Sequence, residues 1–213
     1  MDTFSKVTWS KSEPTLYFKK QVDDILFVCL YVDDLIYVGS SSNLNDSFMD
    51  TMMSEFEMKD LGLMHYFLGM EVHRSKDKIF ICQTKYAKDM LKNYDMDGCK
   101  LVPTPIAHGE LICKDDKAEK VNVTNYRSIV GSLMFLTNNK PDIAYDISFV
   151  SRYMSEPSSL HLKATKRILR YVKGVVVFGI HYFPIKEVEL VGFSDLGWGS
   201  NLDDRIIFLL DLD

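Results

Sequence analysis

Two short runs of apolar residues, separated by a pair of aspartates, form the clearest pattern along the chain. Residues 25–32 read Ile-Leu-Phe-Val-Cys-Leu-Tyr-Val and residues 35–38 read Leu-Ile-Tyr-Val, and Asp33 and Asp34 lie between them. Runs this short, rich in β-branched and aromatic side chains, are typical of buried strands rather than of helices. The pattern therefore predicts a hairpin whose strands are apolar on both faces and whose tip carries both carboxylates.

The aspartate pair has two interpretations. Aspartate is a common turn former, so Asp-Asp between two strands is often turn chemistry alone. Alternatively, adjacent anionic groups are costly unless something positive shares their site, and hard oxygen ligands favour Mg²⁺ or Mn²⁺. Because a solvent-facing hairpin would not be apolar on both faces, we favour a metal site formed by Asp33 and Asp34.

The residues around this hairpin predict further elements. After Gly39-Ser40-Ser41-Ser42, Asn43 or Asn45 is a candidate N-cap for a helix that ends near Phe56, because apolar residues recur there at four-residue steps. The next segments predict a second hairpin over 64–72 and 79–82 and a short helix over 86–94.

The second half of the chain favours helices. Residues 109–120 form a charged connector without periodicity, for which we expect a mobile loop. Proline and apolar patterning then predict three helices that pack together, over 125–138, 141–154 and 158–173. Two strands are expected afterwards, over 175–183 and 188–194. The fold class predicted for the whole chain is α+β.

Composition indicates a protein with a buried core and without a membrane segment. The chain of 213 residues is 46% hydrophobic and 26% charged, and no apolar stretch approaches the roughly 20 residues that span a bilayer. The first residues also lack the apolar segment of a secretory signal, so we expect an intracellular protein. The four cysteines show no metal-ligand spacing, and we expect Cys29 and Cys82 to be buried free thiols.

Positive charge gathers in one region although the net charge is −5. Between residues 121 and 186 there are nine Lys or Arg against three acids. Five of these cations follow helical spacing and would form one stripe: Lys163, Lys166, Arg167, Arg170 and Lys173. The stripe could follow a phosphate backbone, or it could be the solvated face of a helix that packs on the core, and both can hold at once.

An ordered set of segments resembles a known family. Tyr31-Val32-Asp33-Asp34 is similar to the Tyr-x-Asp-Asp hairpin of reverse transcriptases. It is followed by Phe56-Glu57-Met58-Lys59-Asp60-Leu61-Gly62, then His65-Tyr66-Phe67-Leu68-Gly69-Met70-Glu71-Val72, and later by Tyr126-Arg127-Ser128-Ile129-Val130-Gly131-Ser132-Leu133 and His161-Leu162-Lys163-Ala164-Thr165-Lys166-Arg167. In this order they resemble the polymerase of copia-type retrotransposons of the plant kind, over roughly residues 12 to 205.

The resemblance implies nucleotidyl transfer on an RNA or DNA template–primer with two metal ions, Mg²⁺ or Mn²⁺. Asp33 would be the principal metal ligand and Asp34 an auxiliary one, with Tyr31 and Val32 under the primer terminus. Gly69, in a hairpin similar to the element that holds the primer, would let the backbone approach nucleic acid. Alternatively, Gly69 relieves a bend in a strand.

The resemblance also divides the chain into four segments. These are a partial palm (1–83), a thumb-like helix with a charged linker (84–120), a helical basic connection region (121–186) and the start of a ribonuclease H domain (187–213). By this match Asp195 is the first metal ligand of the nuclease, at a vestigial site. We expect truncation at both ends, and the palm aspartate that shares the metal ions with Asp33 and Asp34 has no match here.

Three hypotheses follow. The chain is an incomplete reverse transcriptase, inert alone or active with a complementing polymerase fragment. Alternatively, it is a non-catalytic nucleic-acid-binding module that uses the basic stripe. As a third possibility, it is a translated remnant without function, prone to aggregate through an exposed sheet edge.

Overall fold

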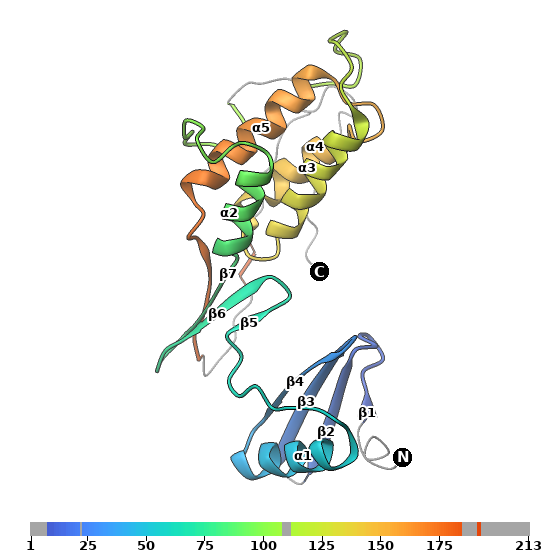
Figure 1. Ribbon diagram of the computed structural model, residues 1–213, viewed down its shortest axis with the longest axis vertical. Coiled ribbons are helices and arrows are strands. Elements are labelled where there is room, and N and C mark those ends of the chain that lie inside the picture. Colours follow the sequence, from blue (N-terminus) through green and yellow to red (C-terminus); the bar gives the residue numbers. More distant parts are fainter. Residues whose placement is uncertain (1–7, 22, 108–111, 185–190, 193–213) are drawn as a thin grey trace. The chain divides into compact units, whose positions relative to one another are not determined.

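The computed structural model describes residues 8–21, 23–107, 112–184 and 191–192 (Figure 1). The chain divides into two compact units, Met1–Leu63 and Met64–Asp213. Each unit combines at least one helix with an antiparallel sheet. The predicted α+β class is therefore confirmed.

Unit 1 is a four-stranded sheet with one helix. The strands β1 (Thr8–Trp9), β2 (Leu16–Gln21), β3 (Asp24–Tyr31) and β4 (Asp34–Gly39) are antiparallel and adjacent in chain order. Helix α1 (Ser42–Glu55) follows β4. The structure thus confirms the predicted hairpin and the helix after it.

The sheet of unit 1 buries one face within the described residues. Side chains alternate along β3, so Leu26 and Val28 point to the face that packs on α1, where Leu44, Phe48 and Met52 complete a small core. The opposite face leaves Phe27 40% and Val38 60% exposed. The expectation that both faces are buried is wrong for this unit, because the single helix covers one side only.

Helix α1 begins earlier than predicted. Its N-cap is Ser41, whose side chain makes no capping hydrogen bond, and not Asn43 or Asn45. The hydroxyls of Ser40 and Ser41 instead donate to the Asp24 carboxylate, at 2.6 and 3.0 Å. Asp24 therefore fixes the turn between β4 and α1, at the end of β3 remote from Asp33.

Unit 2 contains the second sheet. Strands β5 (Tyr66–Phe67), β6 (Met70–Arg74) and β7 (Ile79–Cys82) form the predicted hairpin region. Strand β8 (Gly179–Tyr182) pairs with β7 from far along the sequence, as Figure 1 shows. It is shorter than the strand predicted over 175–183, and most of the strand predicted over 188–194 lies outside the described residues.

The helices of unit 2 form its core. They are α2 (Thr84–Asn93), α3 (Val123–Leu136), η2 (Pro141–Ile143), α4 (Ala144–Ser151) and α5 (Ser159–Gly174). Leu133, Ile147 and Leu169, which come from three of these helices, are almost fully buried in one cluster. The three predicted helices are confirmed, with the middle one opening as a 3-10 turn and ending three residues early.

The connector predicted to be mobile is packed where the structure describes it. Ile112 is buried in the core of unit 2, and its carbonyl accepts a hydrogen bond from the Tyr153 hydroxyl at 3.0 Å. Asp116 is held by Ser158, and the Ser159 amide donates to the Glu119 carbonyl at 2.8 Å. The expectation of a mobile loop is therefore wrong for residues 112–120, because isolated apolar and polar anchors fix it without helical periodicity.

Two smaller expectations can also be compared with the structure. Cys82 is a buried free thiol as predicted, whereas Cys29 is only half-buried, because it lies on the open face of the first sheet. Within the described ranges, every helix is too short or too polar to cross a bilayer.

Candidate functional site

The two aspartates occupy a tight turn between β3 and β4. Tyr31 pairs with Asp34 in the strand ladder, so the loop consists of Val32 and Asp33 alone. Val32 has a φ of +52°, a left-handed conformation that a β-branched residue rarely adopts. Positive φ at the first loop residue is what the tight hairpin requires, and glycine is the usual residue there. Val32 therefore holds local backbone strain directly beside Asp33.

Both carboxylates are accessible. Asp33 and Asp34 are exposed, and Val32 between the strands is 81% exposed. Strand alternation puts Asp34 on the same open face as Tyr31, the face that α1 does not cover. The turn thus presents two adjacent anionic groups and one aromatic ring without steric protection.

The donor chemistry of this turn fits a hard divalent cation. Carboxylate oxygens are the ligands that Mg²⁺ and Mn²⁺ prefer. Among the described residues, however, Asp33 and Asp34 do not gather with a third metal-binding side chain. Asp24 is engaged by Ser40 and Ser41, and Asp195 lies outside the described residues. The turn therefore supplies part of a coordination sphere.

Gly69 lies in a second two-residue turn, between β5 and β6. Phe67 pairs with Met70, and the loop residues Leu68 and Gly69 have φ of +46° and +77°. A side chain at Gly69 would approach the Phe135 ring to 3.0 Å. Turn geometry and the contact with α3 are thus enough to require glycine here.

The structure divides the predicted basic stripe on α5 into two groups. Lys163 and Lys166 are exposed, whereas Arg167, Arg170 and Lys173 are half-buried. Arg170 donates to the Lys100 carbonyl at 2.7 Å, and Lys173 donates to the Cys99 carbonyl at 2.6 Å. These cations therefore hold the segment after α2 against α5.

The two groups meet around a surface hollow of about 380 Å³. Its lining includes four cations of α5 together with apolar and hydroxyl side chains: Met96, Ser159, Leu162, Lys163, Lys166, Arg167 and Arg170. Arg167 also donates to the Thr104 hydroxyl at 3.0 Å. Positive charge is thus concentrated in this hollow, although Arg167 and Arg170 already make hydrogen bonds to the segment after α2.

Sequence reasoning missed a buried polar network at the start of α5. The Ser158 amide donates to Nδ1 of His161 at 2.9 Å, so Nε2 carries the proton and donates to the Cys113 carbonyl at 3.1 Å. The Ser158 hydroxyl donates to Asp116. Ser158 directly before a helix with an apolar face is a typical helix cap, and this was the available signal. Its distant partners Asp116 and Cys113 left no pattern in the local sequence.

The network also sets the ionisation of Asp116. Burial acts to raise the pKa of this carboxyl, but hydrogen bonds from the Ser158 hydroxyl and the Ala118 amide outweigh it, so that the pKa is lowered. The carboxylate is therefore stabilised as an anion inside unit 2.

Lys140 is another buried group that the sequence placed only in the general basic region. Its ammonium donates to the carbonyls of Val175 and Phe178, at 2.7 and 2.8 Å. Burial lowers the pKa of Lys140, with Asp142 and Cys82 acting in the opposite direction. This lysine therefore joins the loop between α3 and η2 to the turn before β8, and its ammonium is already engaged by two carbonyls.

Known proteins resemble this chain over most of its length. The model of the family described as reverse transcriptase (RNA-dependent DNA polymerase) matches residues 3–108. An uncharacterized mitochondrial protein of Arabidopsis thaliana is 37% identical over 84% of this chain and 75% of its own length. No solved structure matches.

Two transposon proteins indicate the type of mobile genetic element. The retrovirus-related Pol polyprotein from transposon RE1 of Arabidopsis thaliana is 33% identical over 92% of this chain. That from transposon TNT 1-94 of Nicotiana tabacum is 34% identical over 91%. The chain spans only 13% and 15% of these polyproteins. The chain accordingly belongs to the reverse transcriptase family of copia-type retrotransposons.

Proposed function

We propose that Asp33 and Asp34 are part of the metal-binding centre of an RNA-directed DNA polymerase. The observation that carries this proposal is the tight β3–β4 turn, which exposes both carboxylates beside Tyr31 in a chain of this family. Bound Mg²⁺ or Mn²⁺ would activate the primer 3′-oxygen and hold the triphosphate. The proposed substrates are deoxynucleoside triphosphates and an RNA or DNA template–primer inside the cell.

The residues of the turn would have different roles according to their positions. Asp33 in the loop would be the principal ligand, and Asp34 at the first position of β4 an auxiliary one. Tyr31 and Val32 would contact the primer terminus, since both are exposed at the tip. The hairpin that turns at Gly69 would hold the primer.

We do not expect these 213 residues to catalyse nucleotidyl transfer alone. Two adjacent carboxylates give too few ligands to hold a pair of metal ions, and no third ligand gathers with them in the described residues. We propose that polypeptide outside these residues, in the same protein or in a complementing fragment, supplies the remaining aspartate.

Primer extension tests this proposal. The purified chain, incubated with template–primer, nucleotides and Mg²⁺ or Mn²⁺, should give no product. Mixed with a fragment that carries the fingers and first palm strand of a relative, it should extend the primer. Asp33→Asn should then reduce the rate by at least about 100-fold. Asp50→Asn, an exposed aspartate of α1, should leave the rate unchanged. Synthesis that survives Asp33→Asn would contradict the assignment, as would extension by the chain alone.

A second candidate function is nucleic-acid binding without catalysis. The specific observation in its favour is the hollow on α5, where Lys163 and Lys166 are exposed beside the partly engaged Arg167 and Arg170. Phosphate groups bind such clusters through charge, and the affinity falls steeply with salt.

Fluorescence anisotropy with a labelled duplex tests this surface. The double variant Lys163→Ser/Lys166→Ser should weaken binding and flatten its dependence on salt concentration, because about two phosphate contacts are lost. Lys76→Ser/Lys78→Ser, which removes two exposed lysines from the β6–β7 turn, is the matched control. Equal loss in both variants would indicate general charge attraction instead of a site on α5.

A further inference from the structure

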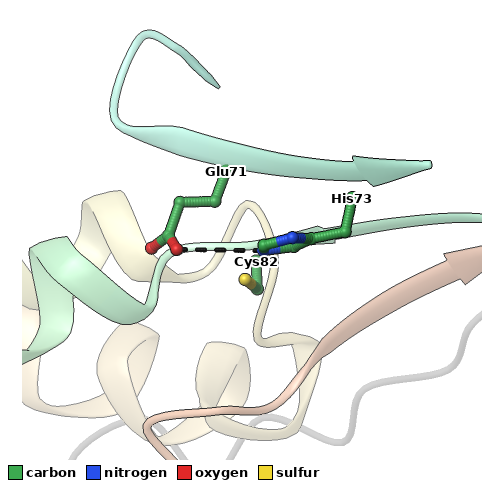
Figure 2. A group of neighbouring side chains, drawn as sticks. All are labelled: Glu71, His73 and Cys82. Carbon is green, nitrogen blue, oxygen red and sulfur yellow. Dashed lines mark ion pairs between the residues drawn. The ribbon is translucent and has the colours of Figure 1, made fainter. Parts of the chain in front are cut away.

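Three side chains of metal-ligating type lie together on the second sheet, in unit 2. Glu71 and His73 are two residues apart on β6, so they point to the same face. Glu71 pairs directly with Cys82 on β7. The ladder thus brings a carboxylate, an imidazole and a thiol to one face of unit 2, as Figure 2 shows.

The distances suit a common ligand. One donor atom from each of the three residues lies within 4.8 Å of the other two, and His73 Nε2 is 3.9 Å from Glu71 Oε2. Tetrahedral zinc with ordinary bond lengths separates its ligand atoms by about 3.3–3.8 Å. A shift of the His73 ring by about 1 Å would close this difference. His73 is 61% exposed, and its ring stacks on that of Phe80 at 6.0 Å.

Glu71 has an ordinary structural role that leaves a ligand atom available. Its Oε1 accepts a hydrogen bond from the Lys85 amide at 2.7 Å, in the first turn of α2. This contact fixes the carboxylate near a helix N-terminus. Its other oxygen, Oε2, is directed toward His73. The helix contact therefore orients Glu71 in the way that a second partner orients a metal ligand.

The thiol completes the set from the buried side. Cys82 is 2% exposed, and Thr84 Oγ1 donates to its sulfur at 3.4 Å. On β8, the residue opposite Cys82 is Gly179, which presents no side chain. An ion pair between Glu71 and an exposed histidine would not need the thiol.

We propose that Glu71, His73 and Cys82 bind a zinc ion, with water at the fourth position. A soft sulfur together with nitrogen and oxygen ligands is a zinc set, whereas Mg²⁺ and Mn²⁺ prefer oxygen alone. Carboxylate and thiolate neutralise the two charges of Zn²⁺, so the ammonium of Lys140, which interacts electrostatically with Cys82, would meet a neutral centre. The ion joins β6, β7 and the start of α2, and it is distinct from the proposed polymerase metals at Asp33 and Asp34.

Isothermal titration of the reduced, tag-free chain with ZnCl₂ tests the site. We expect one ion per chain with a Kd of about 1 µM or tighter. Co²⁺ in place of Zn²⁺ should give a thiolate-to-cobalt charge-transfer band, which reports sulfur ligation directly. Glu71→Gln, which keeps an oxygen for the Lys85 amide, and His73→Ala should each weaken binding by at least about tenfold. Cys82→Ser should abolish the charge-transfer band.

Matched variants separate this site from other residues. His65→Ala, Cys29→Ser and Asp50→Asn should leave the Zn²⁺ affinity unchanged, and circular dichroism of each variant establishes that it is folded. Because Glu71 and His73 are on the surface side, their variants remain informative if Cys82→Ser unfolds. Absence of binding at a zinc concentration of about 100 µM would overturn the proposal, as would unchanged affinity in Glu71→Gln and His73→Ala. The result is independent of primer extension, so either proposal can fail alone.

Discussion

The hydroxyl of Ser158 donates a hydrogen bond to the carboxylate of Asp116, 42 residues earlier in the chain. The same hydroxyl caps α5 by accepting from the His161 amide at 3.3 Å. One side chain thereby fixes a helix start and the connector that crosses it. Ser158 is fully buried and the Asp116 side chain is 5% exposed, so water has little access to this contact.

Ser158→Ala should destabilise unit 2 by about 2–3 kcal/mol, because it removes a helix cap and leaves a buried carboxylate without its donor. Urea unfolding followed by circular dichroism measures the effect. Ser159→Ala, the exposed neighbour at the first position of α5, is the control and should change stability by less than about 0.5 kcal/mol. Equal effects of the two substitutions would contradict the structural role of Ser158.

Acid should weaken the same contact. The pKa of Asp116 is lowered from its ordinary value of 3.8 in the folded protein, so its contribution to stability is present above that value. The contribution is lost as pH falls through the lower, folded pKa. Urea unfolding midpoints are measured at about one point per pH unit from pH 6 to pH 2. They should fall more steeply with decreasing pH for the parent than for Asp116→Asn. Parallel curves would show that this carboxyl does not contribute.

Val32→Gly should stabilise the β3–β4 hairpin. In the complemented primer-extension assay the same variant should lower the rate, because Val32 is a proposed contact of the primer terminus. Glycine removes the strain of a β-branched residue at φ +52°, worth about 1–3 kcal/mol, and adds about 0.5–1 kcal/mol of chain entropy cost. A net gain of about 1 kcal/mol is expected. Thermal unfolding of the variant measures it, and loss of stability would show that the strain is not present in solution.

Gly69→Ala should destabilise unit 2 by about 1–3 kcal/mol, since the residue has φ +77° and a Cβ would meet the Phe135 ring. Gly98→Ala is the matched control, because nothing lies within 4 Å of a Cβ at that position. If Gly69 acts only as a turn residue, the folded variant keeps its affinity for template–primer. A selective loss of affinity would instead favour the predicted approach of nucleic acid to this backbone.

Arg170→Met should lower stability by about 1–2 kcal/mol, because the Lys100 carbonyl loses a charged donor. Lys166→Met, an exposed cation one turn earlier on α5, should change stability by less than about 0.5 kcal/mol. Differential scanning calorimetry compares the two variants. An equal stability in both would contradict the division of the basic stripe into structural and exposed groups.

Local patterns were enough to predict most elements. The apolar runs around Asp33 and Asp34 specify strands, because alternation and β-branching act over a few residues. The two polar residues between the runs place the hairpin tip to within one residue, since the loop is Val32 and Asp33, and Asp34 already pairs in β4. Helices such as α5 were predicted for the same reason, since a periodic apolar face requires a core to pack against. The ordered motifs also indicated the family, which the relatives confirm.

Tertiary structure decided what depends on distant partners. The sequence shows that β3 is apolar but not that α1 covers one face only, because coverage depends on which elements are nearby. It shows Arg167, Arg170 and Lys173 as a regular stripe, whereas their carbonyl and hydroxyl partners come from the segment after α2. It shows Glu71, His73 and Cys82 as unrelated positions until strand pairing places them on one face. The preference for a strand or a helix depends on neighbouring residues. Hydrogen-bond partners and ligand sets instead depend on long-range contacts that only the folded chain creates.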